Sequence, residues 1–124
     1  MLSALITDLY ERGLERKVLL VVWGEFGRTP RVNKTGGRDH WGLLMSILVA
    51  GGGLNVGQVI GASNKNGEVP VDRPVAPTDV LATMYRHLGI DTPHHTLTLQ
   101  GRPIPILPPG EPLPDLLSLS EPTR

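Results

Sequence analysis

The sequence contains no cysteine among its 124 residues. This excludes disulfide bonds and thiolate chemistry and leaves the redox compartment undetermined. Neither sign of charge is in excess, because 12 Lys and Arg balance 12 Asp and Glu, so there is no electrostatic argument for binding nucleic acid or an anionic membrane. No apolar run approaches the roughly 20 residues needed to span a bilayer. The N-terminal segment lacks a basic leader, an apolar block and a cleavage site, and therefore predicts a helix and not a signal peptide.

Aromatic residues are also few, at 4%, whereas the chain has 15 Gly and 12 Pro. This composition indicates that much of the chain is loop. The length is that of one small domain. We expect a domain over residues 1–112 and an extended, disordered tail over residues 113–124.

The first third of the sequence predicts a helix followed by a buried strand. Leu2, Leu5, Ile6 and Leu9 follow the spacing of one helical face, and Gly13 is a natural helix stop. The unbroken apolar run 18–23 is typical of a strand buried on both faces, as in a parallel sheet. A helix followed by such a strand is half of a βαβ unit, which predicts an α/β fold.

Further elements follow along the chain. The run 45–50 favours a strand, although its periodicity does not exclude a helix, and residues 51–53 (Gly-Gly-Gly) predict a turn. A short strand is expected at 58–62, with a turn over 63–68 in which Asn-Gly supplies positive φ. The clearest helix is 78–88, closed by Gly89. From residue 103 the proline-rich chain predicts an extended segment that could add an edge strand.

The loop between residues 24 and 41 carries nearly all the side chains suited to chemistry. His40 follows Asp39, and a neutral imidazole oriented by a carboxylate can bind a metal; the alternative is a surface histidine in a turn. Glu25 lies at the end of the predicted strand, after Gly24, where ligands bind in open α/β sheets. Its alternative role is to cap the loop or to pair with Arg28.

Cationic side chains in the same loop are candidates for binding an oxyanion such as phosphate or sulfate. We favour Arg28 and Arg38 for this role, and a solvated surface position for Arg31 and Lys34. The pair 94–95 (His-His) is interpreted as a surface pair and not as a metal site. No serine lies in a G-x-S-x-G setting, so the sequence gives no support for nucleophilic acyl transfer.

Several ordered motifs carry a resemblance to a known family: VVWGEFGRTPRVN, GGRDHW, AGGG, GQVIGAS, DRPVAPTDVLATMYRHLGID and GRPIPI. Together they resemble the C-terminal part of the bacterial domain-of-unknown-function fifteen-oh-one proteins, over roughly residues 2–111. That family is considered similar to the alkaline phosphatase superfamily, which includes sulfatases and phosphodiesterases. The resemblance implies the C-terminal portion of an alkaline-phosphatase-like three-layer α/β/α sheet domain, incomplete in this chain.

The same resemblance implies a function and a site. Glu25 and His40 take the positions of metal ligands, with Asp39 as an auxiliary ligand or a partner that orients His40, and Arg28 and Arg38 lie near the oxyanion. The cofactor would be a divalent metal (zinc, calcium or manganese). The implied reaction is metal-assisted hydrolysis of a small-molecule or carbohydrate ester of sulfate or phosphate, through a covalent intermediate. Relatives are typically exported.

Two departures from the superfamily pattern qualify this expectation. Phe26 stands where a second metal ligand is expected, and the superfamily's nucleophile has no counterpart in the chain. We therefore expect no catalytic nucleophile here, and a fragment of a sulfatase-like metallohydrolase that is inactive alone. The alternative is a non-catalytic binding or scaffold protein that retains the fold. We also expect the chain to self-associate through an exposed sheet edge.

Overall fold

The computed structural model describes residues 1–92 and 96–117. These residues form a mixed α/β chain of two helices and short strand pairs, which confirms the predicted α/β class. The chain divides into two compact units, residues 1–74 and 75–124. No helix within the described ranges is long and apolar enough to cross a membrane.

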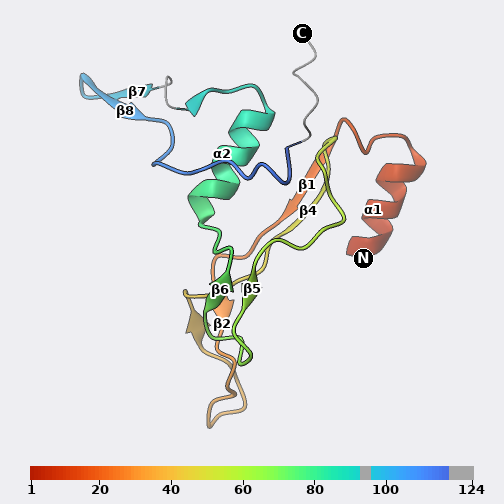
Figure 1. Cartoon of the computed structure of the whole chain (residues 1–124), viewed down its shortest axis with the longest axis vertical. Helices are drawn as coiled ribbons and strands as arrows, with labels where there is room; N and C mark the ends of the chain where they lie inside the picture. The colour runs from red at the N-terminus through yellow and green to blue at the C-terminus, as the bar shows by residue number, and fades with distance from the viewer. Residues whose placement is uncertain (93–95, 118–124) are drawn as a thin grey trace. The chain divides into compact units, whose positions relative to one another are not determined.

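The first unit contains the first helix and three strand pairs (Figure 1). The bounds are α1 (Leu2–Glu11), β1 (Leu19–Val22), β2 (Gly27–Arg28), β3 (His40–Trp41), β4 (Leu48–Gly51), β5 (Ala62–Ser63) and β6 (Pro70–Asp72). The pairs are β1 with β4, β2 with β3, and β5 with β6. None of the residues of α1 is buried. Arg12, just after this helix, donates from Nε to Asp8 Oδ1 at 2.8 Å, and this hydrogen bond raises the pKa of Arg12.

Both helices end as the positions of glycine predict. Gly13 follows α1 with φ of +65°, the amide of Leu14 donates to the carbonyl of Leu9, and that of Gly13 donates to Tyr10. The helix α2 (Pro77–His87) ends in the same way at Gly89, whose φ is +76°. A left-handed residue with this pair of hydrogen bonds is the Schellman motif, which satisfies carbonyls that would otherwise lack partners.

The expectation of a parallel, doubly buried strand is wrong for β1. This strand pairs antiparallel with β4, with Leu19 opposite Gly51 and Val22 opposite Leu48. Its side chains are only half-buried, and Val22 is 40% exposed. The chain returns from β1 to β4 through a long excursion that contains no helix, whereas a parallel neighbour requires a crossover connection, usually helical.

The strand predicted at 58–62 is wrong except at its last residue, Ala62. Only Ala62 and Ser63 form β5, opposite β6. Gly57 and Gly61 have φ of +84° and +82°, a backbone conformation incompatible with a regular strand. The turn expected at 63–68 is present, and Gly67 has the predicted positive φ of +68°. The Gly-Gly-Gly segment is also a turn, since all three residues have positive φ.

The second unit is built around α2 and also contains a hairpin (Figure 1). The hairpin joins β7 (Thr96–Leu99) and β8 (Arg102–Pro105) through Gln100 and Gly101, both with positive φ, as a type I′ turn requires. The buried hydrophobic side chains of this unit are Val80, Ala82, Leu107 and Leu116.

The segment after the hairpin lies along α2. Asp79, at the third position of α2, accepts the amide of Ala76 at 2.8 Å through Oδ2 and the amide of Glu111 at 2.9 Å through Oδ1. One turn later, Thr83 Oγ1 accepts the amide of Leu113 at 2.8 Å. The helix therefore fixes residues 111–113, and Leu116 in the expected tail is buried. The remainder of that tail, residues 118–124, lies outside the described residues.

Candidate functional site

The candidate loop is folded as a hairpin closed by β2 and β3. The two strands pair antiparallel, with Arg28 opposite His40 and Gly27 opposite Trp41. Directly opposed residues of an antiparallel pair place their side chains on the same face. Arg28 and His40 are therefore cross-strand neighbours, although twelve positions separate them in sequence, and both are exposed.

The ring of Phe26 contacts both of these side chains. Its centroid lies 4.0 Å from that of the His40 imidazole, with an interplanar angle of 33°. The guanidinium carbon of Arg28 lies 5.4 Å from the same centroid, within the range of a cation–π interaction. Phe26 is half-buried. The histidine and the arginine therefore contact one and the same aromatic ring.

The opposite face of the hairpin is fixed by Trp41. Its indole Nε1 donates to the carbonyl of Glu68 at 2.7 Å, which connects β3 to the turn between β5 and β6. Gly27, opposite Trp41, has no side chain, and the carbonyl oxygen of Leu44 occupies the place where a Cβ would lie. The chain after Trp41 thus folds closely over β2, and this contact requires glycine.

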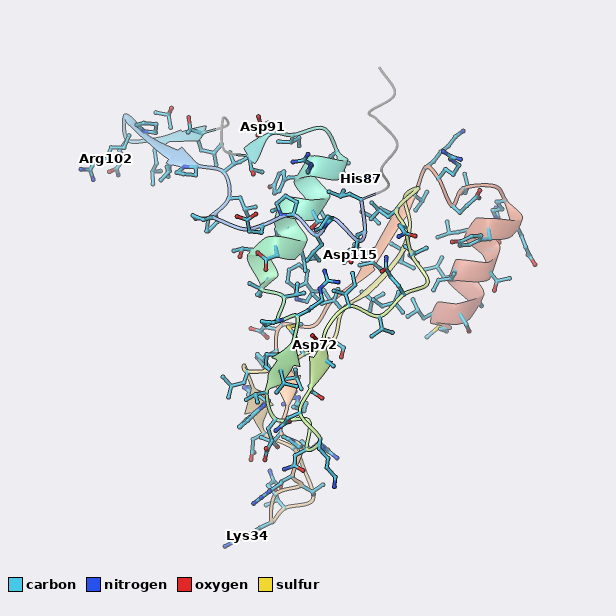
Figure 2. All side chains as sticks on the ribbon, viewed as in Figure 1. Lys34, Asp72, His87, Asp91, Arg102 and Asp115 are labelled. Carbon is cyan, nitrogen blue, oxygen red and sulfur yellow. The ribbon has the colours of Figure 1, made fainter. Side chains whose placement is uncertain are left out.

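Asn33 organises the tip of the hairpin. Its Oδ1 accepts from the amide of Thr35 at 3.1 Å, from the hydroxyl of Thr35 at 2.8 Å and from the amide of Gly37 at 2.9 Å. The backbone N–H of Asn33 donates to the carbonyl of Gly37 at 2.7 Å. Lys34 lies at the end of the loop, exposed, as expected for a solvated cation (Figure 2). The tip is held by polar contacts and not by an apolar core.

Arg38 and Asp39 take part in the same network. Arg38 Nη1 donates to the carbonyls of Thr29 and Pro30, both at 2.8 Å. Asp39 Oδ1 accepts from Asn33 Nδ2 at 2.9 Å, and the backbone amide of Asp39 donates to Thr29 Oγ1 at 3.0 Å. Both side chains therefore close the loop.

Glu25 lies on the bend between β1 and β2 and is exposed. It follows β1, which ends at Val22, as predicted. It directly precedes Phe26 in sequence. Among the residues that the structure describes, however, no three His, Cys, Asp or Glu side chains are grouped so as to hold a metal ion. The hairpin brings together Arg28 and His40, the proposed oxyanion-binding and metal-binding residues, but it does not supply a complete set of ligands.

The described residues include one further histidine, which belongs to the second unit. His87 is the last residue of α2 (Figure 2). His94 and His95, interpreted from the sequence as a surface pair, lie outside the described residues.

Sequence reasoning missed two residues on which the site depends. Asn33 is one, although an Asn followed by Lys, Thr and two Gly predicts a turn organised by a side chain. The other was Phe26, which was treated only as an absent metal ligand. Its contacts depend on the register of β2 and β3, and no local sequence signal indicates that register.

Comparison with known proteins places the chain in a family. The family model described as "Protein of unknown function (DUF1501)" matches residues 1–117. The chain belongs to this family. The resemblance inferred from the loop and helix motifs is thereby confirmed at the level of the family. No curated protein and no solved structure matches the chain.

Proposed function

We propose that this chain is part of a metal-dependent hydrolase of sulfate or phosphate esters, with a three-layer α/β/α sheet domain like that of alkaline phosphatase. In this proposal His40 and Glu25 are metal ligands and Arg28 binds the anionic group of the ester. The observation that carries it is the register of the hairpin, which sets Arg28 directly opposite His40 on one exposed face. A guanidinium beside an imidazole is suited to an anion held next to a metal.

The types of donor in the loop fit a divalent metal, but their number does not complete a site. An imidazole and a carboxylate suit zinc or manganese better than calcium, which prefers oxygen ligands alone. A catalytic zinc site takes three protein ligands, and the described residues form no group of three. The remaining ligands and the nucleophile would come from outside these residues. When bound, the metal would act as a Lewis acid on the ester oxygens.

The chain's own residues divide the remaining work. Arg28 can donate two parallel N–H groups to a sulfate or phosphate oxygen pair. Asp39 uses Oδ1 to hold Asn33, and we propose that it is an auxiliary ligand or orients His40. Arg38 supports the loop through Nη1, so any contact it makes with the anion would add to that structural role.

Metal binding by the chain tests this proposal. We expect zinc and manganese to bind more tightly than calcium in calorimetric titrations. Glu25→Ala and His40→Ala should each raise the Kd by at least the roughly tenfold that loss of a ligand's supporting partner costs. Glu11→Ala and His87→Ala are matched controls from the two helices and should bind like the parent. The metal assignment is wrong if the parent binds none of the three ions, or if Glu25→Ala and His40→Ala bind as tightly as the parent.

Anion binding tests the second half of the proposal. Inorganic sulfate and phosphate should perturb the backbone amide NMR signals of the β2–β3 hairpin, and Arg28→Ala should abolish that response. Lys34→Ala is the control, because this cation lies at the tip of the same loop. An equal response in the parent and in Arg28→Ala would remove Arg28 from the site.

A second candidate function is a non-catalytic binding or scaffold protein that keeps the fold. One observation favours it: Phe26, whose side chain cannot bind a metal, stands where the resemblance places a second metal ligand. On this reading the chain would bind neither metal nor sulfate through the hairpin, so the same titrations separate the two functions.

A further inference from the structure

Three side chains form a compact stack on one face of the β2–β3 hairpin. The His40 ring lies 4.0 Å from Phe26 between centroids, and the Arg28 guanidinium carbon lies 5.4 Å from the same ring. Arg28 and His40 are exposed, and Phe26 is half-buried. The aromatic ring is therefore not a component of a hydrophobic core. It is the shared support of two polar side chains.

We propose that Phe26 is a positioning residue that fixes the orientation of His40 for metal binding and of Arg28 for anion binding. This inference rests on the function proposed above and assigns a role to a residue that binds neither ligand itself. An exposed histidine or arginine samples several rotamers, and binding a ligand in one of them costs side-chain entropy. Contact with a common ring reduces that cost before the ligand arrives.

The geometry leaves the functional atoms available. A ring-to-ring contact with a 33° tilt covers the face of the imidazole, whereas its two nitrogens lie in the ring edge and bind in the ring plane. In a cation–π contact the ring face attracts the guanidinium, and the N–H donors, which lie in the guanidinium plane, can still point to an anion. Phe26 can therefore hold both groups without competing for their ligand atoms.

The positions of Phe26 and His40 are fixed by contacts of their neighbours in sequence. Phe26 directly precedes Gly27, which lies under the carbonyl oxygen of Leu44. On the partner strand, His40 precedes Trp41, whose indole is bound to the carbonyl of Glu68 at 2.7 Å. Both members of the stacked pair are thus adjacent to positions where tertiary contacts fix the strand. A ring held by such a strand can orient its neighbours.

Substitutions of Phe26 separate orientation from simple packing. Phe26→Leu and Phe26→Met remove the ring and keep an apolar side chain, whereas Phe26→Tyr keeps the ring. The NMR signals of the His40 ring protons should show a ring-current shift in the parent and in Phe26→Tyr, and should lose it in Phe26→Leu and Phe26→Met. Thermal melts of all variants show whether each remains folded.

Zinc alone and inorganic phosphate alone are the probes of function. In titrations of the full chain, with zinc followed by calorimetry and phosphate by the backbone amide NMR signals of the hairpin, Phe26→Leu should weaken zinc binding and phosphate binding each by roughly two- to tenfold, the range expected for loss of an aromatic pair. Phe26→Tyr should restore parental affinity. In a His40→Ala background, Phe26→Leu should have no further effect on zinc, because the two changes act through one interaction.

The outcomes distinguish this inference from the function on which it rests. If His40→Ala weakens zinc binding but Phe26→Leu does not, the metal site stands and the positioning role is refuted. If His40→Ala leaves zinc binding unchanged, the proposed metal site fails. An unchanged His40 ring-proton shift in Phe26→Leu would refute the positioning role whatever happens to zinc. Equal loss in a folded Phe26→Leu and a folded Phe26→Tyr would also refute it, since the ring would then not be the cause.

Discussion

Thr83 offers the sharpest test of how the chain after the β7–β8 hairpin is bound to α2. This side chain is 2% exposed. Its hydroxyl donates to the carbonyl of Asp79 at 2.6 Å and accepts the amide of Leu113 at 2.8 Å. The substitution Thr83→Val keeps the shape of the side chain but removes both the donor and the acceptor. The amide of Leu113 then lacks its partner in a part-buried position.

The expected cost follows from that lost partner. Leaving a buried donor unsatisfied costs about 1–3 kcal/mol, whereas the carbonyl of Asp79 retains its helical role. Because about 1.4 kcal/mol corresponds to a factor of ten, local opening around Leu113 should become about 5- to 140-fold more frequent. Thr83→Ser keeps the hydroxyl and loses one methyl group, so it should retain most of the protection of this amide.

Native-state amide hydrogen exchange measures this opening residue by residue. Exchange at Leu113 should accelerate in Thr83→Val by the stated factor and remain close to the parent rate in Thr83→Ser. Amides of α1, which belong to the other unit, should be unaffected. The reasoning is refuted if Leu113 exchanges equally fast in the parent and in Thr83→Val, or if Thr83→Ser accelerates exchange as much as Thr83→Val does.

Three other predictions concern the first unit. Gly27→Ala should lower the free energy of unfolding by about 1–3 kcal/mol, because its Cβ would overlap the carbonyl oxygen of Leu44. Gly42→Ala is the control: a Cβ there would have nothing within 4 Å, so the free energy of unfolding should change by less than about 0.5 kcal/mol. Urea titrations measure both, and equal effects would contradict this packing. Asn33→Ala should speed amide exchange at Gly37 by about tenfold, since a bond of 2.9 Å is lost, and an unchanged rate would show that the backbone alone holds the tip. The chain should associate as its concentration rises in light-scattering measurements, and Val22→Lys on the exposed end of β1 should reduce that association; a parent that stays monomeric would refute it.

Much of the local structure was predictable because it depends on neighbours in sequence. Gly13 and Gly89 indicate the ends of α1 and α2, since the left-handed backbone of a Schellman motif favours glycine. The Asn-Gly pair in the turn after β5 likewise indicates positive φ, and Gly67 has it. The mixed α/β class follows from the same local patterns.

Pairing between distant segments was not predictable in the same way. The apolar run of β1 indicates a parallel neighbour, but the return of the chain to β4 makes the pair antiparallel. The hydrogen bonds from the amides of Glu111 and Leu113 to Asp79 and Thr83 are likewise contacts between distant segments. No pattern near residue 111 indicates a partner some thirty residues earlier.

The loop between β1 and β4 shows both what local sequence patterns indicate and what only the pairing of strands decides. Residue types and their spacing indicate the family, the helices with their glycine ends, and the concentration of chemistry-bearing side chains between residues 24 and 41. Tertiary structure alone decided that Arg28 faces His40 and that Phe26 supports both. The physical reason is that residue type and spacing govern backbone conformation locally, whereas the contacts of a side chain depend on strand register, which is fixed only when remote segments pack.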